Sequence, residues 1–359
     1  MRVLLDTTYG RYAPYSGTAI YLDRLTEALL AAGEVEVLSV ANPRRRPPAG
    51  GGVGSVRNLA VDARWAEVEL PRLATRLRAD VVHHPLPALA RAPGVAQVIT
   101  VHDLAFERLP GCFDRRFRLY AHHAQRRAAR RADAIICVSE TTAADVRSLW
   151  EVPRERIVVA RHGPGQAVGG SARGKDPSYF LYVGDAEPRK NLRLLLGAYA
   201  RYRERISSPA PLVLAGSAEV DMPGVRVERA PTPQRLKRLY ASALALIQPS
   251  LHEGFGLTAL EAMSLGVPVM AARSPGLLET CAGAALYVDP HSEEELAAQM
   301  ARVTRVPELR RTLSNLGAKR ALDFSWALSA QAHAVAYRLA RARPAVQTPS
   351  RPPTLSDAK

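Results

Sequence analysis

Short, largely apolar runs alternate with amphipathic stretches along most of this chain. Stretches with helical spacing, such as residues 20–30 before Gly33, lie between the runs. Continuous apolar runs are typical of strands buried on both faces, and strands that alternate with helices predict a parallel sheet covered on both sides. The sequence therefore predicts an α/β fold. The expected strands lie at residues 3–5, 35–40, 81–84, 96–101, 134–138, 180–183, 212–215 and 244–248.

The alternation is interrupted between residues 163 and 177, where glycine and proline become frequent. This composition is typical of a linker, and 359 residues are enough for two cores of ordinary size. We therefore expect two Rossmann-like domains that face each other across a cleft, at residues 1–165 and 176–325. Ligands of open parallel sheets bind at the carboxyl ends of the strands, so the site should line that cleft. Residues 344–359 are rich in Pro, Ser and Thr and are predicted to be disordered.

Two glutamates flank a glycine-containing turn in the second half of the chain. In HEGFGLTALE, residues 252–261, a Gly-Phe-Gly turn opens a helix between Glu253 and Glu261. Glycine lets the backbone approach a ligand closely, and the free N–H groups of a helix start favour a phosphate. Helical side chains tilt toward the N-terminus, which aims Glu261 at such a ligand, while Glu253 can face its other end. A ligand that has phosphate at its centre and hydroxyl groups at both ends is a nucleotide sugar. The alternative is a tight turn with two solvated glutamates. The predicted donor contacts here are Gly254, Phe255, Gly256, Leu257, Thr258 and Glu261.

This segment resembles the glutamate–seven–glutamate motif of family 4 of the retaining glycosyltransferases, which have the GT-B fold. The resemblance extends to TVHDL at 100–104, YFLYVG at 179–184, EPRKNL at 187–192 and FSW at 324–326. It implies a last helix, at residues 326–343, that crosses back to the first domain. It also implies transfer of a hexose to a glycan or lipid-linked acceptor. The HDL and EPRKN forms are similar to those of bacterial mannosyltransferases, which suggests mannose from GDP-mannose, while UDP-glucose and other donors stay open.

Four further positions follow from the same resemblance. Lys190 matches the family's diphosphate-binding lysine, and Arg189 supplies a second cation beside a predicted helix start. Two such cations can neutralise a leaving diphosphate; an ion pair of Arg189 with Glu187 is the alternative. His102 follows the strand at 96–101 and matches the family's active-site histidine. Gly17, in the loop before the first helix, is a candidate contact for the acceptor or the donor phosphate.

The resemblance assigns the catalytic roles to His102 and Glu253. It favours front-face attack, in which the leaving phosphate accepts the acceptor's proton and Glu253 stabilises positive charge on the sugar. A covalent sugar on Glu253, as in a retaining glycosidase, is the alternative. The Asp-X-Asp metal motif of other glycosyltransferase folds is absent from the sequence, so we expect no metal and no other cofactor.

The composition limits the cellular compartment and the binding partners that we expect. Cys112, Cys137 and Cys281 are scattered, no apolar run reaches the length of a membrane span, and the N-terminal run is too short for a signal peptide. We expect a cytoplasmic protein. Aromatic residues are 6% of the chain and no nucleic-acid-binding motif occurs, so nucleic acid is not an expected partner.

The chain has a net charge of +15, and some of its basic residues are concentrated in one predicted helix. A basic helix with apolar side chains can lie on anionic lipid at the inner face of the membrane, and a solvated surface helix is the alternative. The residues concerned are Arg115, Arg116, Arg118, Arg126, Arg127, Arg130 and Arg131, with Phe113, Phe117, Leu119 and Tyr120.

Three other functions are alternatives to a transferase. The same fold could serve a sugar-nucleotide epimerase or a non-catalytic scaffold that binds a nucleotide sugar. A dinucleotide-binding oxidoreductase is disfavoured, because no Gly-X-Gly-X-X-Gly follows the first strand.

Overall fold

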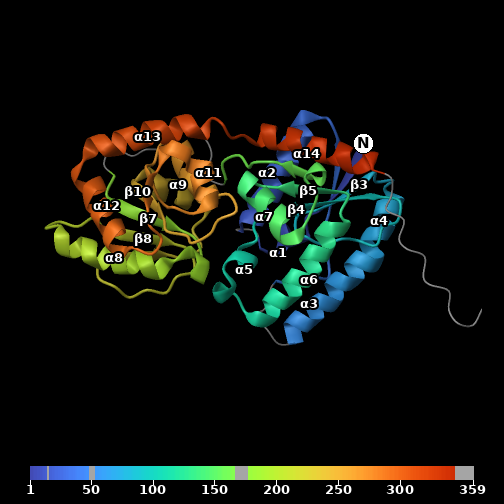
Figure 1. The fold of residues 1–359 in the computed structure, drawn as a ribbon, viewed down its shortest axis with the longest axis horizontal. Coiled ribbons are helices and arrows are strands. Elements are labelled where there is room, and N and C mark those ends of the chain that lie inside the picture. Colours follow the sequence, from blue (N-terminus) through green and yellow to red (C-terminus); the bar gives the residue numbers. More distant parts are fainter. Residues whose placement is uncertain (14–15, 48–52, 166–176, 344–359) are drawn as a thin grey trace, which may run out of the picture.

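The computed structural model describes residues 1–13, 16–47, 53–165 and 177–343. It consists of two α/β units that lie next to each other, one on each side of a narrow waist (Figure 1). The predicted disorder of residues 344–359 concerns a segment outside the described residues.

The first unit is built on a six-stranded parallel sheet with the order β2-β1-β3-β4-β5-β6. Helices connect its parallel strands and cover its faces, so the α/β fold and the strand positions predicted for this half are confirmed. Its strands are β1 (Arg2–Asp6), β2 (Glu36–Val40), β3 (Val81–His84), β4 (Ala96–Val101), β5 (Ala134–Cys137) and β6 (Ile157–Val159). Its helices are α1 (Thr8–Tyr12), α2 (Gly17–Ala32), α3 (Val53–Arg64), η1 (Trp65–Glu69), α4 (Leu70–Arg76), α5 (Ala105–Arg108), η2 (Pro110–Cys112), α6 (Arg115–Arg131), α7 (Glu140–Trp150) and η3 (Arg154–Arg156).

The second unit repeats this architecture with a sheet in the order β12-β11-β10-β7-β8-β9. Its strands are β7 (Tyr179–Val183), β8 (Leu212–Ala215), β9 (Val225–Glu228), β10 (Ala243–Gln248), β11 (Val269–Ala272) and β12 (Leu286–Val288). Its helices are η4 (Pro188–Lys190), α8 (Leu192–Arg205), α9 (Pro233–Ala241), α10 (Leu257–Ser264), α11 (Pro275–Cys281), η5 (Ala282–Ala284), α12 (Glu293–Arg305) and α13 (Pro307–Ala321).

Each sheet contains one point at which the strand order reverses. In the first sheet it lies between β1 and β3, and in the second between β7 and β10. The connections that leave two such strands run to opposite faces, which opens a crevice at their carboxyl ends. The loops after β7 and β10 are therefore the expected place for a ligand in the second unit.

The last helix, α14 (Trp326–Ala342), lies on the first unit although it follows the second in sequence (Figure 1). It packs against α2 and against β4, β5 and β6, where Tyr337 and Ala340 join the core of the first sheet. The Trp326 indole N–H donates a hydrogen bond to the Pro164 carbonyl at 2.7 Å. The two segments that pass between the units are thus bonded to each other.

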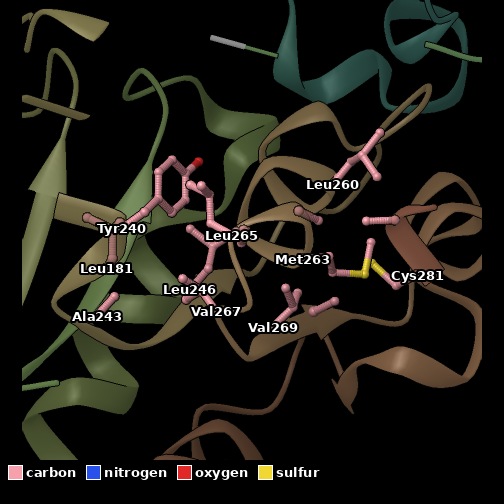
Figure 2. Packing of buried hydrophobic residues seen from close by; sticks show 14 of the residues in the cluster. Leu181, Tyr240, Ala243, Leu246, Leu260, Met263, Leu265, Val267, Val269 and Cys281 are labelled. Carbon is pink, nitrogen blue, oxygen red and sulfur yellow. The ribbon is translucent and has the colours of Figure 1, made fainter. Parts of the chain in front are cut away.

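The helix α10, which follows the Gly-Phe-Gly turn, packs into a compact apolar core (Figure 2). Leu260 and Met263 of α10 pack with Leu246 of β10 and Val269 of β11, and all four side chains are buried. Burial of a side chain of this size contributes roughly 1.5–3 kcal/mol. These contacts fix the position of the helix start relative to the ends of the strands.

Candidate functional site

Two cations and one carboxylate meet in the crevice between β7 and β10. Lys190 Nζ lies 2.7 Å from Glu253 Oε1, and Arg189 Nη1 lies 3.5 Å from Glu253 Oε2. Arg189 also pairs with Glu187 at 2.7 Å, so the ion pair considered as an alternative is present beside the functional contact. The structure brings the two cations predicted at the diphosphate together with the glutamate predicted at the transferred sugar.

The loops that carry these residues are bonded to each other. The Leu251 N–H donates to the Arg189 carbonyl at 2.9 Å, and the Asn191 side-chain amide donates to the Pro249 carbonyl at 3.1 Å. Since the two loops follow neighbouring strands, the strand order explains why residues 63 positions apart form one cluster.

Glu253 is a buried carboxylate, only 7% exposed, that remains ionised. Burial alone favours the neutral acid, but the neighbouring Lys190 and Arg189 charges outweigh it and hold the pKa of the Glu253 carboxyl at about 2. The Gln248 amide donates to Glu253 Oε1 at 3.1 Å and accepts from the Thr258 hydroxyl at 2.9 Å. These bonds hold the carboxylate in one orientation.

Gln248 was missed by sequence reasoning. It is the last residue of β10 and is buried at 4% exposure, at the carboxyl end where a cleft residue belongs. A polar residue that closes an otherwise apolar strand was the available signal. Thr258 of α10, which was predicted as a donor contact, does not bond to Glu253 directly in these hydrogen bonds; its hydroxyl donates to Gln248, which in turn donates to Glu253.

Both glycines of the turn are required by their surroundings. Gly256 caps α10 in the left-handed region at φ 99°, which other residues adopt at a cost. A Cβ at position 254 would lie 1.8 Å from the carbonyl oxygen of His102. Only glycine permits this approach, so the turn of the second unit touches the active-site candidate of the first. Phe255 is buried between the units, with its ring 5.2 Å from that of His162.

His102 carries a neutral imidazole with a defined tautomer. Burial lowers its pKa, although the nearby Asp103 charge opposes the effect. Its Nε2 lies 3.0 Å from the Pro85 carbonyl, and a carbonyl can only accept, so Nε2 carries the proton and Nδ1 keeps a lone pair. The edge of the Tyr21 ring packs against it, with ring centres 5.0 Å apart.

Glu261 lies deeper than its predicted partner Glu253. It is 3% exposed, accepts a hydrogen bond from Tyr240 at 3.0 Å, and approaches the connecting segment so closely that a Cβ on Gly165 would lie 2.0 Å from its Oε1. Leu257 begins α10 one turn before it. A role for Glu261 in binding a ribose stays a prediction.

Gly17 is the exposed first residue of α2, and a Cβ there would meet no heavy atom within 4 Å. One turn later, Tyr21 contacts His102. Gly17 therefore lies at the open end of a helix that leads to the candidate site, and its contact with a ligand stays a prediction.

The basic helix predicted from the charge pattern is α6. Asp114 caps its start, and Arg126 and Arg130 pair with Glu151. Leu119 and Tyr120 are 56% and 59% exposed. Across the described ranges, no helix is long and apolar enough to cross a membrane, and no three of His, Cys, Asp and Glu are grouped as metal ligands would be.

Comparison with protein families gives two matches that follow each other along the chain. Residues 15–163 match the family described as Glycosyltransferase Family 4, and residues 169–320 match Glycosyl transferases group 1. The first match covers the unit that holds His102, and the second covers the unit that holds Glu253 and Lys190.

Individual relatives have related descriptions. O-antigen chain mannosyltransferase B of Escherichia coli is 29% identical over 257 residues, which are 64% of this chain and 66% of the relative, slightly under two thirds of its length. Among solved structures, sucrose-phosphate synthase from Thermosynechococcus elongatus has a TM-score of 0.74 at 21% identity and covers 94% of this chain and 98% of its own. Anabaena HepE, solved with UDP-glucose, has a TM-score of 0.67 at 16% identity and covers 92% of this chain and 97% of its own.

Proposed function

Because the chain belongs to family 4 of the GT-B glycosyltransferases, we propose that it is a retaining hexosyltransferase that takes its sugar from a nucleotide sugar. The acceptor is a glycan or a lipid-linked glycan. One observation carries the proposal: Glu253 is buried and ionised between Lys190 and Arg189, in the crevice where the strand order of the second sheet reverses.

Lys190 and Arg189 bind the diphosphate of the donor. Two adjacent cations stabilise negative charge as it develops on the leaving diphosphate, which is the task that a metal performs in other transferases. The reaction therefore proceeds without a metal. Mannose from GDP-mannose is the first donor to test, because the Escherichia coli relative is described as a mannosyltransferase; UDP-glucose, the ligand of HepE, is the second.

Glu253 and His102 act on the transferred sugar from opposite sides of the contact at Gly254. The Glu253 carboxylate, ionised at neutral pH, stabilises positive charge at the anomeric carbon. The neutral imidazole of His102 accepts a hydrogen bond from the sugar at Nδ1, since its Nε2 proton is held by Pro85. The acceptor attacks from the face on which the diphosphate leaves, and its proton passes to the phosphate.

We also propose that the exposed face of α6 binds to the surface of an anionic membrane. Arg116, Tyr120, His123, Arg127 and Arg131 recur at three- and four-residue spacing and are all exposed, so cations and an aromatic side chain share one face. Each such cation near an anionic membrane contributes about 1 kcal/mol. A lipid-linked acceptor would be met at that surface.

Vesicle sedimentation tests this contact. Replacing both Arg127 and Arg131 by Glu should abolish binding to vesicles that contain phosphatidylglycerol. The control replaces Arg302 and Lys319, two exposed cations of the second unit, by Glu, which changes the net charge by the same amount. Equal loss in both double variants would show a general charge effect and refute a specific α6 surface.

The donor experiment combines thermal shift with turnover. GDP-mannose, GDP, UDP-glucose, UDP and NAD are compared, because a ligand that binds only the folded state raises its stability. Stabilisation by one nucleotide family, followed by acceptor-dependent sugar transfer, supports the proposal. Conversion of the donor sugar without an acceptor would identify an epimerase, and binding without any turnover would identify a scaffold.

A further inference from the structure

The start of α7, in the first unit, is bound by a carboxylate of the second unit. Glu279 of α11 accepts hydrogen bonds from the backbone N–H groups of Glu140 and Thr141 at 3.0 and 2.9 Å. The Thr141 hydroxyl adds a third bond at 3.0 Å. Free N–H groups and the positive end of the helix dipole make a helix start a favourable partner for a carboxylate.

The connecting segment contributes a cation to the same carboxylate. Arg161 Nε and Nη2 each lie 3.2 Å from Glu279 Oε1, and the Glu279 side chain is only 16% exposed. From the other side, Arg320 of α13 donates to the backbone carbonyls of Glu279 and Thr280 at 2.9 and 3.0 Å. Glu279 is therefore held firmly by its own unit while its carboxylate binds the other.

The start of α7 also binds the Gly-Phe-Gly turn that follows Glu253. Ser139, which caps α7, donates from its hydroxyl to the Gly254 carbonyl at 2.5 Å. The Thr142 hydroxyl lies 3.3 Å from the Gly254 carbonyl and 3.3 Å from the His102 carbonyl. Gly254 is the neighbour of Glu253, so the placement of α7 sets how Glu253 faces His102.

We propose that Glu279 is a positioning residue of the transfer reaction. It binds the start of α7 and so keeps the two units in the relative position in which Glu253 and His102 face each other. The inference rests on the proposed function, because the two residues act on one sugar only when the units are held in that position. Domains joined by connecting segments move relative to each other by default, and misplacement by about 1 Å can cost 100-fold in rate. The five bonds to the Glu279 carboxylate oppose that motion at the edge of the site.

The kinetic test separates positioning from donor binding. The proposed contacts to the nucleoside diphosphate, Lys190, Arg189 and Glu261, all belong to the second unit, so Glu279→Gln should leave the Kd of the nucleoside diphosphate product within about twofold. Its kcat should fall at least tenfold, because the two halves of the site assemble less often. Glu279→Asp, which keeps the charge, should recover part of the loss.

Glu295→Gln is the matched control. Glu295 also accepts from a backbone N–H, that of Asp289, and from an arginine, Arg273, but all three belong to the second unit. Its kcat should equal that of the wild type. An equal loss of kcat in both variants would overturn the positioning role.

Hydrogen exchange tests the latch without any substrate. Peptides from residues 139–150 should exchange faster in Glu279→Gln and at the wild-type rate in Glu295→Gln. Unchanged exchange overturns the latch, and faster exchange with wild-type kcat overturns its positioning role. Absence of donor binding and turnover in the wild type would overturn the proposed function and the positioning role together, and exchange would still report whether Glu279 joins the units.

Discussion

Replacing Glu253 by glutamine should reduce stability as well as activity, because the carboxylate is held ionised inside the protein. Its pKa falls from an ordinary 4.5 to about 2. At about 1.4 kcal/mol per pKa unit, this shift corresponds to about 3 kcal/mol of folding free energy at neutral pH. Glu253→Gln keeps the shape and an acceptor for Lys190 but removes the charge, so the free energy of unfolding should fall by about this amount at pH 7.

The loss should depend on pH in one direction. A carboxyl with a depressed folded-state pKa stabilises the protein fully above its unfolded-state pKa, and this stabilisation disappears as pH falls toward the folded-state value. The difference between wild type and Glu253→Gln should be constant from pH 7 to about pH 5.5. Below about pH 4.5 it should shrink by up to 1.4 kcal/mol per pH unit.

Urea denaturation, followed by circular dichroism at pH values from 7 to 3.5, measures this difference. The control is Glu219→Gln, which removes a carboxylate that pairs with Arg229 on the surface, where both side chains are more than half exposed. Surface ion pairs contribute little, so the control should follow the wild type at every pH. A Glu253→Gln difference that is absent at pH 7, or that grows as pH falls, would refute the electrostatic account of the cluster.

Three other outcomes follow from the site. Lys190→Ala should weaken nucleotide binding and reduce kcat/KM for the donor, each by roughly 10- to 100-fold, because a charge-assisted bond of about 1.5–3 kcal/mol is lost; calorimetry and initial rates measure both, and wild-type kinetics would remove Lys190 from the site. Glu261→Gln should mainly raise the donor KM, and a large loss of kcat at unchanged KM would contradict a ribose-binding role. Treatment with EDTA should leave the transfer rate unchanged, whereas inactivation that added metal reverses would contradict a metal-free mechanism.

Much of the fold follows from local pattern. Apolar runs such as 243–248 form strands because side chains on both faces of a covered sheet must be buried, and the chain connects such strands through helices. The Gly-Phe-Gly turn is also local, since Gly256 adopts the left-handed conformation that its residue type favours. That Lys190 and Glu253 belong to one site was predicted only with the family resemblance, and their ion pair is known from the structure alone.

The sequence by itself determined eight of the twelve strands in the described part of the chain, the turn and the residue types of the site, because these depend on neighbours within a few positions. Only the tertiary structure decided which of them meet. Gln248 approaches Glu253 because β10 ends beside the turn, and Tyr240 reaches Glu261 because side chains of α9 and α10 share one apolar core. The bonds that Thr141 donates to Glu279, 138 residues away, depend on how the two α/β units are placed against each other. No local preference of the Thr141 or the Glu279 segment specifies that contact. Each segment packs within its own unit, and only the interface between the two units brings the segments together.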